Sequence, residues 1–422
     1  MRTFLLGCGL AICVSFLTPM PSQAQELVLD SLIREALRSN PDLRSAKLRY
    51  EAFEAKVPQV GSLPDPVFKA AVSNLPVDSW SLDQTPMSGV ELMLTQKIPL
   101  PGKLGLAKKT TRSLAQKVKQ DYESTKNFIL SELKQNYYQL YLLQKSIEIT
   151  QENKLLIENF ARIASTKYSV GKGIQQDVLK AQVEVSKMID KLISLEEMEQ
   201  IVRAKINILL NRNPQDSLGQ ASDLTFREFN YSEEELQSLA VEANPNLKAR
   251  GFLVNASVSA YDLARREYWP DFTLSASYRI RDEVRMDPVR GEDFFSASAA
   301  INIPLYFWSK QKKKVQEKAL DLESSRQKYE DVKNNVKFGV SKLFYSMGKF
   351  RKEIELYQTA ILPQARQSLE SAKSGYQVDK VDFLTLLFNQ VTLFNYEIAY
   401  HQALSSYFKT IAKLEEMVGK SL

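Results

Sequence analysis

Apolar and polar residues alternate in four stretches of this chain, two in each half. The stretches cover residues 67–75, 90–98, 272–280 and 295–303. Successive side chains of a strand point to opposite faces of a sheet, so the alternation predicts strands with one apolar and one polar face. The second pair has roughly the length that a tilted strand needs to cross a bilayer. Alternation alone also fits the edge of a periplasmic β-sandwich.

The two faces of the second strand pair differ in their chemistry. Leu274, Ala276 and Tyr278 belong to the apolar face, which we expect to lie toward lipid. The other face is small and rich in hydroxyl groups, as a water-lined lumen would be. The residues that we expect on this lumen-facing side are Thr273, Ser275, Ser277, Ser296 and Ser298.

A very long helix follows each strand pair. Residues 104–165 carry apolar residues in steps of three and four and contain no proline, and no glycine after Gly105. They predict one helix of roughly 90 Å at the usual rise per residue. A glycine-rich turn leads to a returning helix at 174–210. The second half predicts the same hairpin at 306–373 and 383–417, with a kink near Pro363.

The chain also repeats itself after about 205 residues. Asn40-Pro41-Asp42-Leu43 returns as Asn244-Pro245-Asn246-Leu247, and Ile98-Pro99-Leu100 returns as Ile303-Pro304-Leu305. Asn40-Pro41 interrupts the helical stretch 30–57, because proline suits the start of a helix and not its interior. We therefore expect two structural repeats, residues 25–220 and 221–422, each with a helix, two strands and a long helical hairpin.

Four strands per chain predict assembly with other copies. Four strands cannot close a barrel, and lipid tolerates no open sheet edge. Three copies with four strands each would supply twelve, an even number in the range of transmembrane barrels. The fold class that we expect is an α+β membrane protein. It is a homotrimer with a 12-stranded transmembrane β-barrel that continues into a long α-helical periplasmic barrel.

The N-terminus has the features of a secretory signal. Arg2 precedes a short apolar run that ends before Ser22-Gln23-Ala24, so we expect residues 1–24 to be a signal peptide. Leu5-Leu6-Gly7-Cys8 has the form of a lipoprotein processing site, but it lies too early in the apolar run. The formal net charge is +6, and no nucleic-acid-binding motif accompanies it, so we expect no nucleic acid partner.

Catalytic and metal-binding chemistry is not indicated. His401 is the only histidine, and both cysteines fall within the expected signal peptide, so no ligand set for a transition metal remains. We expect His401 to be a packing or surface residue, no cofactor, and no enzymatic activity. Basic residues follow each strand pair, either as solvated helix starts or as contacts to lipid phosphates. They are Lys103, Lys108, Lys109 and Arg112, and Lys310, Lys312, Lys313, Lys314 and Lys318.

Several separated motifs resemble TolC-type outer-membrane efflux proteins. They are the duplicated Asn-Pro-x-Leu, the Pro64-Asp65-Pro66 that leads into a strand, the glycine turns of the hairpins, and residues 414–419. Ile98-Pro99-Leu100-Pro101-Gly102-Lys103 is similar to the heavy-metal efflux branch, the CzcC and CusC group. The resemblance implies a homotrimeric channel in the outer membrane with a large periplasmic portion. It also implies that the channel docks a periplasmic adaptor (membrane fusion protein) and an inner-membrane pump of the RND class, and conducts substrate passively.

The resemblance also directs attention to the hairpin tips. In that family the periplasmic hairpin ends close like an iris, and aspartates inside the second hairpin ring the aperture. Those positions align with Thr385 and Phe388 here, so Asp379 and Asp382, nearer the tip, become the candidates. Three residues apart, the two aspartates could share a helix face. Alternatively both are solvated turn residues, or Asp379 caps the returning helix, and Phe388 forms an apolar constriction.

Two other functions remain open at this stage. A periplasmic coiled-coil adaptor or scaffold would explain the helices but not the alternating strands. A channel for type I protein secretion or for drugs would have the same architecture as a metal channel, since a passive tunnel carries what its pump selects.

Overall fold

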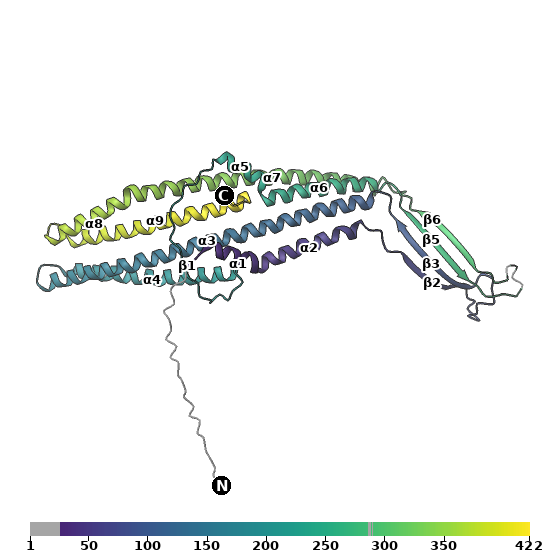
Figure 1. The fold of residues 1–422 in the computed structure, drawn as a ribbon, viewed down its shortest axis with the longest axis horizontal. Coiled ribbons are helices and arrows are strands. Elements are labelled where there is room, and N and C mark those ends of the chain that lie inside the picture. Colours follow the sequence, from purple (N-terminus) through teal and green to yellow (C-terminus); the bar gives the residue numbers. More distant parts are fainter. Residues whose placement is uncertain (1–25, 286–287, 289) are drawn as a thin grey trace, which may run out of the picture.

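The computed structural model describes residues 26–285, 288 and 290–422. Figure 1 shows an elongated molecule with all four long strands at one end and long helices along the rest of its length. The expected signal peptide 1–24, with Cys8, lies outside the described residues. Within the described residues, none of the helices combines the length and the apolar character that crossing a membrane requires.

The elements occur in the same order in the two halves of the chain. The first half contains β1 (Glu26–Leu27), α1 (Leu29–Ser39), α2 (Pro41–Gly61), β2 (Val67–Ser73), β3 (Gly89–Ile98), α3 (Lys103–Ser169) and α4 (Gln175–Leu209). The second begins with β4 (Gln220–Ala221), which pairs with β1. It continues with α5 (Glu233–Ala243), α6 (Pro245–Arg266), β5 (Phe272–Ile280), β6 (Phe294–Ile301), α7 (Gln311–Leu356), the π-helical turn η1 (Tyr357–Ile361), α8 (Leu362–Gln377) and α9 (Phe383–Val418).

The repeated Asn-Pro motif has the same structural role twice. Asn40 separates α1 from α2, and its side chain accepts a hydrogen bond from the Leu43 amide at 3.1 Å. Its Nδ2 donates to the Leu209 carbonyl at the end of α4, 2.9 Å away. Asn244 caps α6 in the same manner and donates to the Met417 carbonyl at 2.7 Å. Each asparagine thus caps one helix and fixes it to the end of a returning long helix.

The long helices confirm the predicted hairpins. α3 has 67 residues, about 100 Å at 1.5 Å per residue, and the second outgoing helix runs through α7, η1 and α8. Near Pro363, where a kink was expected, the helix contains the π-helical turn η1, which ends two residues before the proline. The prediction that this helix begins at residue 306 was wrong, because residues 305–310 form turns and α7 begins at Gln311.

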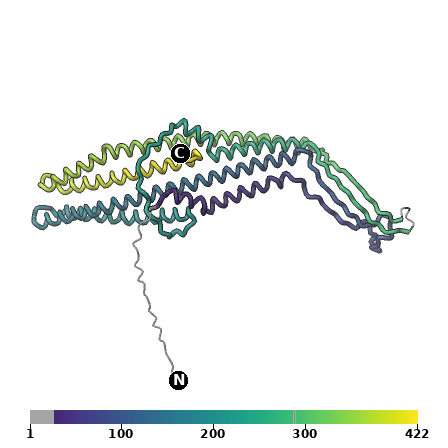
Figure 2. The backbone as a smooth tube through the Cα atoms, viewed as in Figure 1, coloured from purple at the N-terminus to yellow at the C-terminus, as the bar shows by residue number. Residues whose placement is uncertain are grey.

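The two hairpins lie side by side and pack against each other along their length (Figure 2). Near the tips, Ile157 of α3 and Met188 of α4 are buried in the same cluster as Leu386 and Phe394 of α9. Three further clusters follow along the helices. The apolar steps of three and four therefore form a line of small cores instead of one globular centre.

The four long strands form one antiparallel sheet in the order β2-β3-β5-β6. The strands predicted at 67–75, 90–98, 272–280 and 295–303 are confirmed within two residues at each end. The central pair β3–β5 joins the two halves of the chain, with Ile98 opposite Phe272.

Candidate functional site: channel surfaces and hairpin tips

The serine and threonine residues of the sheet share one face. Ser275 of β5 lies opposite Thr95 of β3 on one side and opposite Ser298 of β6 on the other. The Oγ atoms of Thr95 and Ser275 are 3.1 Å apart. Because directly paired residues point to the same side of a sheet, the five residues predicted as lumen-facing lie on this face: Thr273, Ser275, Ser277, Ser296 and Ser298.

This polar face also contains charge. Arg279 and Glu91 lie opposite each other, with their side chains 3.6 Å apart. The face is therefore rich in hydroxyl groups but not free of charged groups. The opposite face is apolar and includes Leu274, Ala276 and Tyr278, which pair with apolar residues of β6.

A buried ion pair lies where the sheet meets the helices. Lys103, the first residue of α3, donates from Nζ to Asp271 Oδ1 at 2.7 Å and to the Trp269 carbonyl at 2.8 Å. The Leu100 amide donates to the same carboxylate oxygen at 3.0 Å. The Lys103 side chain is only 11% exposed. Lys103 is therefore not the solvated helix start that the sequence allowed, because it neutralises a carboxylate just before β5.

Asp379 lies in the turn between α8 and α9 and connects the two hairpin tips. Its backbone has a φ of 57°, in the left-handed region that Asp tolerates better than most residues. Lys167 near the tip of α3 donates from Nζ to Asp379 Oδ1 at 2.5 Å and lies 4.1 Å from the centre of the Tyr376 ring. The hydrogen bond from Lys167 holds the pKa of Asp379 below its usual range.

Asp382, not Asp379, caps the returning helix. Its side chain accepts a hydrogen bond from the Thr385 amide at 2.6 Å, and this bond lowers the pKa of Asp382. The prediction that the two aspartates share a helix face was wrong, because Asp379 lies in a turn and Asp382 is the N-cap residue directly before α9. The reason is the left-handed turn at Asp379, which local spacing does not reveal.

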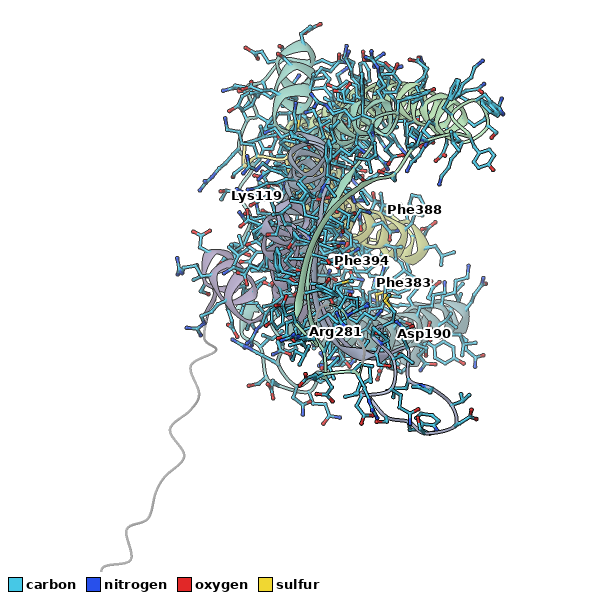
Figure 3. All side chains as sticks on the ribbon, turned by 90° about the vertical axis from the view of Figure 1, so that its right-hand side faces the viewer. Lys119, Asp190, Arg281, Phe383, Phe388 and Phe394 are labelled. Atoms are coloured by element: carbon cyan, nitrogen blue, oxygen red, sulfur yellow. The ribbon has the colours of Figure 1, made fainter. Side chains whose placement is uncertain are left out.

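Thr385 and Phe388 are exposed on the first turns of α9. Phe388 is 70% exposed, whereas Phe383 and Phe394 on the same helix are buried in the core of the hairpins. In Figure 3, which looks along the molecule, Phe388 lies on the side of α9 opposite to Phe383 and Phe394. A large apolar side chain so exposed next to a hairpin tip is suited to contact another surface.

His401 is a packing residue, as expected. Its Nδ1 lies 2.8 Å from the Tyr141 hydroxyl, and its ring stacks edge-on against Tyr141 and Tyr400. Burial lowers the pKa of His401, and Lys145 adds to this effect. In the ranges that the structure describes, no three His, Cys, Asp or Glu side chains are grouped closely enough to hold a metal ion.

Two important residues were missed or misinterpreted in the sequence. Lys167 was not singled out, although it directly precedes Tyr168, which matches Tyr376 in the second half. Asp271 was given no role, and its partner Lys103 lies 168 residues away. Local spacing gave no signal for either pair, because the partners lie 168 and 212 residues apart in the sequence.

A two-faced antiparallel sheet that continues into long helical hairpins defines the architecture of an outer membrane channel protein. The chain belongs to the family described as outer membrane efflux protein, whose pattern matches residues 32–211 and 236–420. This membership makes the chain an outer membrane efflux protein, as the resemblance predicted, and places it in that membrane with a large periplasmic portion.

Similar proteins of known name or structure agree with this family. The chain is 22% identical over the full length of both proteins to the cobalt-zinc-cadmium resistance protein CzcC of Cupriavidus metallidurans. The outer membrane protein VceC of Vibrio cholerae has a similar structure, with a TM-score of 0.79, 18% identity, and coverage of 93% of this chain and 96% of VceC. CusC matches with a TM-score of 0.78, 15% identity, and coverage of 96% of each chain. The structural matches show the fold.

Proposed function

We propose that three copies of this chain form a channel that conducts substrate outward across the outer membrane and performs no chemistry itself. The observation that carries the proposal is the four-stranded sheet with one apolar and one hydroxyl-rich face. Such a sheet suits contact with lipid on one side and water on the other. Three copies would close twelve strands into a barrel, with Thr273, Ser275, Ser277, Ser296 and Ser298 toward the lumen and Leu274, Ala276 and Tyr278 toward lipid.

The helical hairpins would continue the conduit into the periplasm. Their length of about 100 Å supports docking to a periplasmic adaptor and, through it, to an inner-membrane pump of the RND class. The proposed channel includes two structural repeats in each chain, residues 25–220 and 221–422. Each repeat would contribute two strands and one helical hairpin. The family match favours the channel over the adaptor or scaffold that the helices alone would allow.

We assign heavy-metal cations to this channel as cargo. The full-length similarity to a protein named for cobalt, zinc and cadmium resistance supports this assignment, as does the motif from Ile98 to Lys103. Drugs or secreted proteins are the competing cargoes. In a host that carries the matching pump and adaptor, loss of the channel should lower tolerance to these cations. Unchanged metal tolerance together with lost drug tolerance would contradict the metal assignment and leave the channel intact.

The periplasmic gate in this proposal is formed at the tips of the second hairpin. Asp379, Asp382, Thr385 and Phe388 are its candidate residues. Asp379 is neutralised by Lys167, so Asp382 would supply the unpaired carboxylate. Phe388 would supply an apolar constriction, since its ring is 70% exposed near the start of α9.

The mass of the assembly tests the channel directly. Native mass spectrometry of the protein extracted from outer membranes should show a trimer, and planar bilayers that contain it should conduct ions. A folded, membrane-inserted monomer would contradict the proposal, because one chain leaves two open sheet edges in lipid.

A further inference from the structure

The two strand hairpins of the chain have the same internal register. Val67 lies opposite Thr95 in β2–β3, and Thr273 lies opposite Ala300 in β5–β6. Thr273 follows Val67 by 206 positions, and Ala300 follows Thr95 by 205. The hairpins are therefore equivalent residue by residue, so a contact made by one hairpin predicts a contact of the other.

The sequence repeat gives the same equivalence. A shift of 206 positions superposes Asp65, just before β2, on Asp271, just before β5. A shift of 205 superposes Ile98 at the end of β3 on Ile303 just after β6. The sequence repeat and the strand register therefore give the same two shifts, 206 and 205, although they are independent observations.

Between the two hairpins, the joint of β3 and β5 has two components. The strands pair with Ile98 opposite Phe272. Beyond the strand ends, Lys103 is paired with the carboxylate of Asp271 at 2.7 Å. By the two shifts, the residues of β3 have equivalents on or just after β6, and those of β5 have equivalents on or next to β2.

Those outer edges are uncovered in the single chain. Within the described residues, β2 and β6 each pair with one strand only. Phe68 of β2 is 65% exposed and Phe295 of β6 is 70% exposed, compared with 44% for Tyr278 on the central strand β5. An edge of this kind requires a partner strand in lipid.

We propose that β6 of one copy pairs with β2 of the next copy in the register that β3 uses with β5. This inference rests on the proposed trimer and adds the residues that meet at its seams. The two shifts place Ser298 opposite Ala71 of the neighbouring copy, Ile301 opposite Phe68, and Ala300 opposite Lys69. Apolar residues then meet apolar residues on the lipid face across the whole seam.

The repeat is needed to select this register from the alternatives. A slip by one residue would place Ile301 opposite Val67, a residue of the polar face, and so mix the two faces. A slip by two residues keeps the faces and would place Ser298 opposite Lys69 or Ser73 instead. Only the equivalence with β3–β5 distinguishes Ala71 from these two neighbours.

The joint of β3 and β5 also suggests an ion pair near each seam. The shift of 205 superposes Lys103 on Trp308, and the nearest lysine is Lys310, two positions further on and directly before α7. In the described part of the chain, Lys310 and Asp65 are both exposed and neither takes part in an ion pair. The geometry points to a pair between Lys310 of one copy and Asp65 of the next, as the counterpart of Lys103 and Asp271.

Disulfide trapping in the assembled protein tests the register. After mild oxidation, Ser298→Cys with Ala71→Cys should yield a covalent trimer, because directly opposed residues lie within disulfide reach and diagonal ones do not. The matched controls are Ser298→Cys with Lys69→Cys, Ser298→Cys with Ser73→Cys, and each single variant. Preferential cross-linking of either control pair would overturn the register.

Native mass spectrometry of the same samples separates the two proposals. A trimer without a cross-link between positions 298 and 71 would contradict the register and leave the proposed function standing. Absence of any trimer would contradict both.

Charge exchange tests the ion pair. Asp65→Lys alone and Lys310→Asp alone should each lower the temperature at which the trimer dissociates in detergent, and the double variant should restore it. Asp65→Lys combined with Lys312→Asp is the matched control and should not restore it. Equal recovery with both lysines, or none with either, would contradict the pair.

Discussion

Lys409 on α9 has its ammonium group in the interface with α3. Its Nζ donates to Gln139 Oε1, and burial, with a smaller effect of Lys413, lowers its pKa to about 8. Below pH 8 the charge is present in both the folded and the unfolded chain, and its burial opposes folding. As the pH rises from 8 toward the ordinary value of 10.5, the folded form loses the proton first, so this cost declines.

Replacement of this lysine should therefore stabilise the protein in a pH-dependent manner. We expect Lys409→Met to raise the unfolding temperature of the detergent-solubilised protein at pH 7, with an advantage that shrinks between pH 8 and pH 10.5. Calorimetry across this range measures the effect. The exposed Lys352→Met is the control, and an advantage of Lys409→Met that is constant with pH would contradict the burial argument.

At the scale of elements, the two hairpins contact each other at their tips through Lys167. This lysine joins α3 to the turn before α9, with hydrogen bonds to Asp379 and to the Tyr376 carbonyl. The pair is exposed to solvent on the Asp379 side, so its contribution to stability is small. Because the Lys167–Asp379 pair lies at the proposed gate, we expect it to affect conductance more than stability.

The two tip aspartates should therefore have different effects on conductance. Asp382→Asn keeps a good helix cap and removes an unpaired carboxylate, so we expect lower cation preference and weaker block by multivalent cations. Asp379→Asn removes the ion pair with Lys167 that connects the two hairpin tips. We therefore expect a higher basal conductance. Planar-bilayer recordings measure both.

The outcome at the tip also decides the role of Phe388. If Asp379→Asn and Asp382→Asn leave selectivity, block and basal conductance unchanged, these aspartates are not the gate. Phe388→Ala should then increase the conductance on its own, because it removes the exposed ring.

At the scale of the whole molecule, the alternation of side chains gives the sheet one face for lipid and one for the water-filled lumen of the proposed channel. Ser275→Cys and Ser277→Cys should react with a water-soluble thiol reagent that enters the channel, and Leu274→Cys and Ala276→Cys should not. The measurement is mass spectrometry of the labelled protein in outer membranes. The opposite labelling pattern would show that the two faces are exchanged.

Much of this architecture is visible in the sequence because it depends on local periodicity. The alternation from Phe272 to Ile280 reproduces the strand bounds, since each side chain there faces one of two environments. Helix α7 begins later than predicted, because Tyr306, Phe307 and Trp308 carry the apolar character of a helix start but lie in turns. The lumen and gate assignments, and the division at residue 220, stay predictions.

Long-range contacts account for what the sequence did not reveal. Lys103 looked like one solvated lysine among several, and only the approach of Asp271 makes it a buried partner. Asp379 and Asp382 looked alike by spacing, but the contact with Lys167 and the left-handed turn give them different roles. Charge partners distant in sequence cannot be read from a local pattern.

The pairing of β3 with β5 has a consequence for the order of events during biogenesis. Thr95 and Ser275 touch although 180 residues separate them, so the β2–β3 ribbon is synthesised long before its neighbour. Closure over such a distance is slow, and until then β3 offers a bare edge to any extended peptide. We therefore expect the partly synthesised chain to depend on a chaperone that shields this ribbon. We also expect a chain truncated before β5 to aggregate instead of forming half a channel.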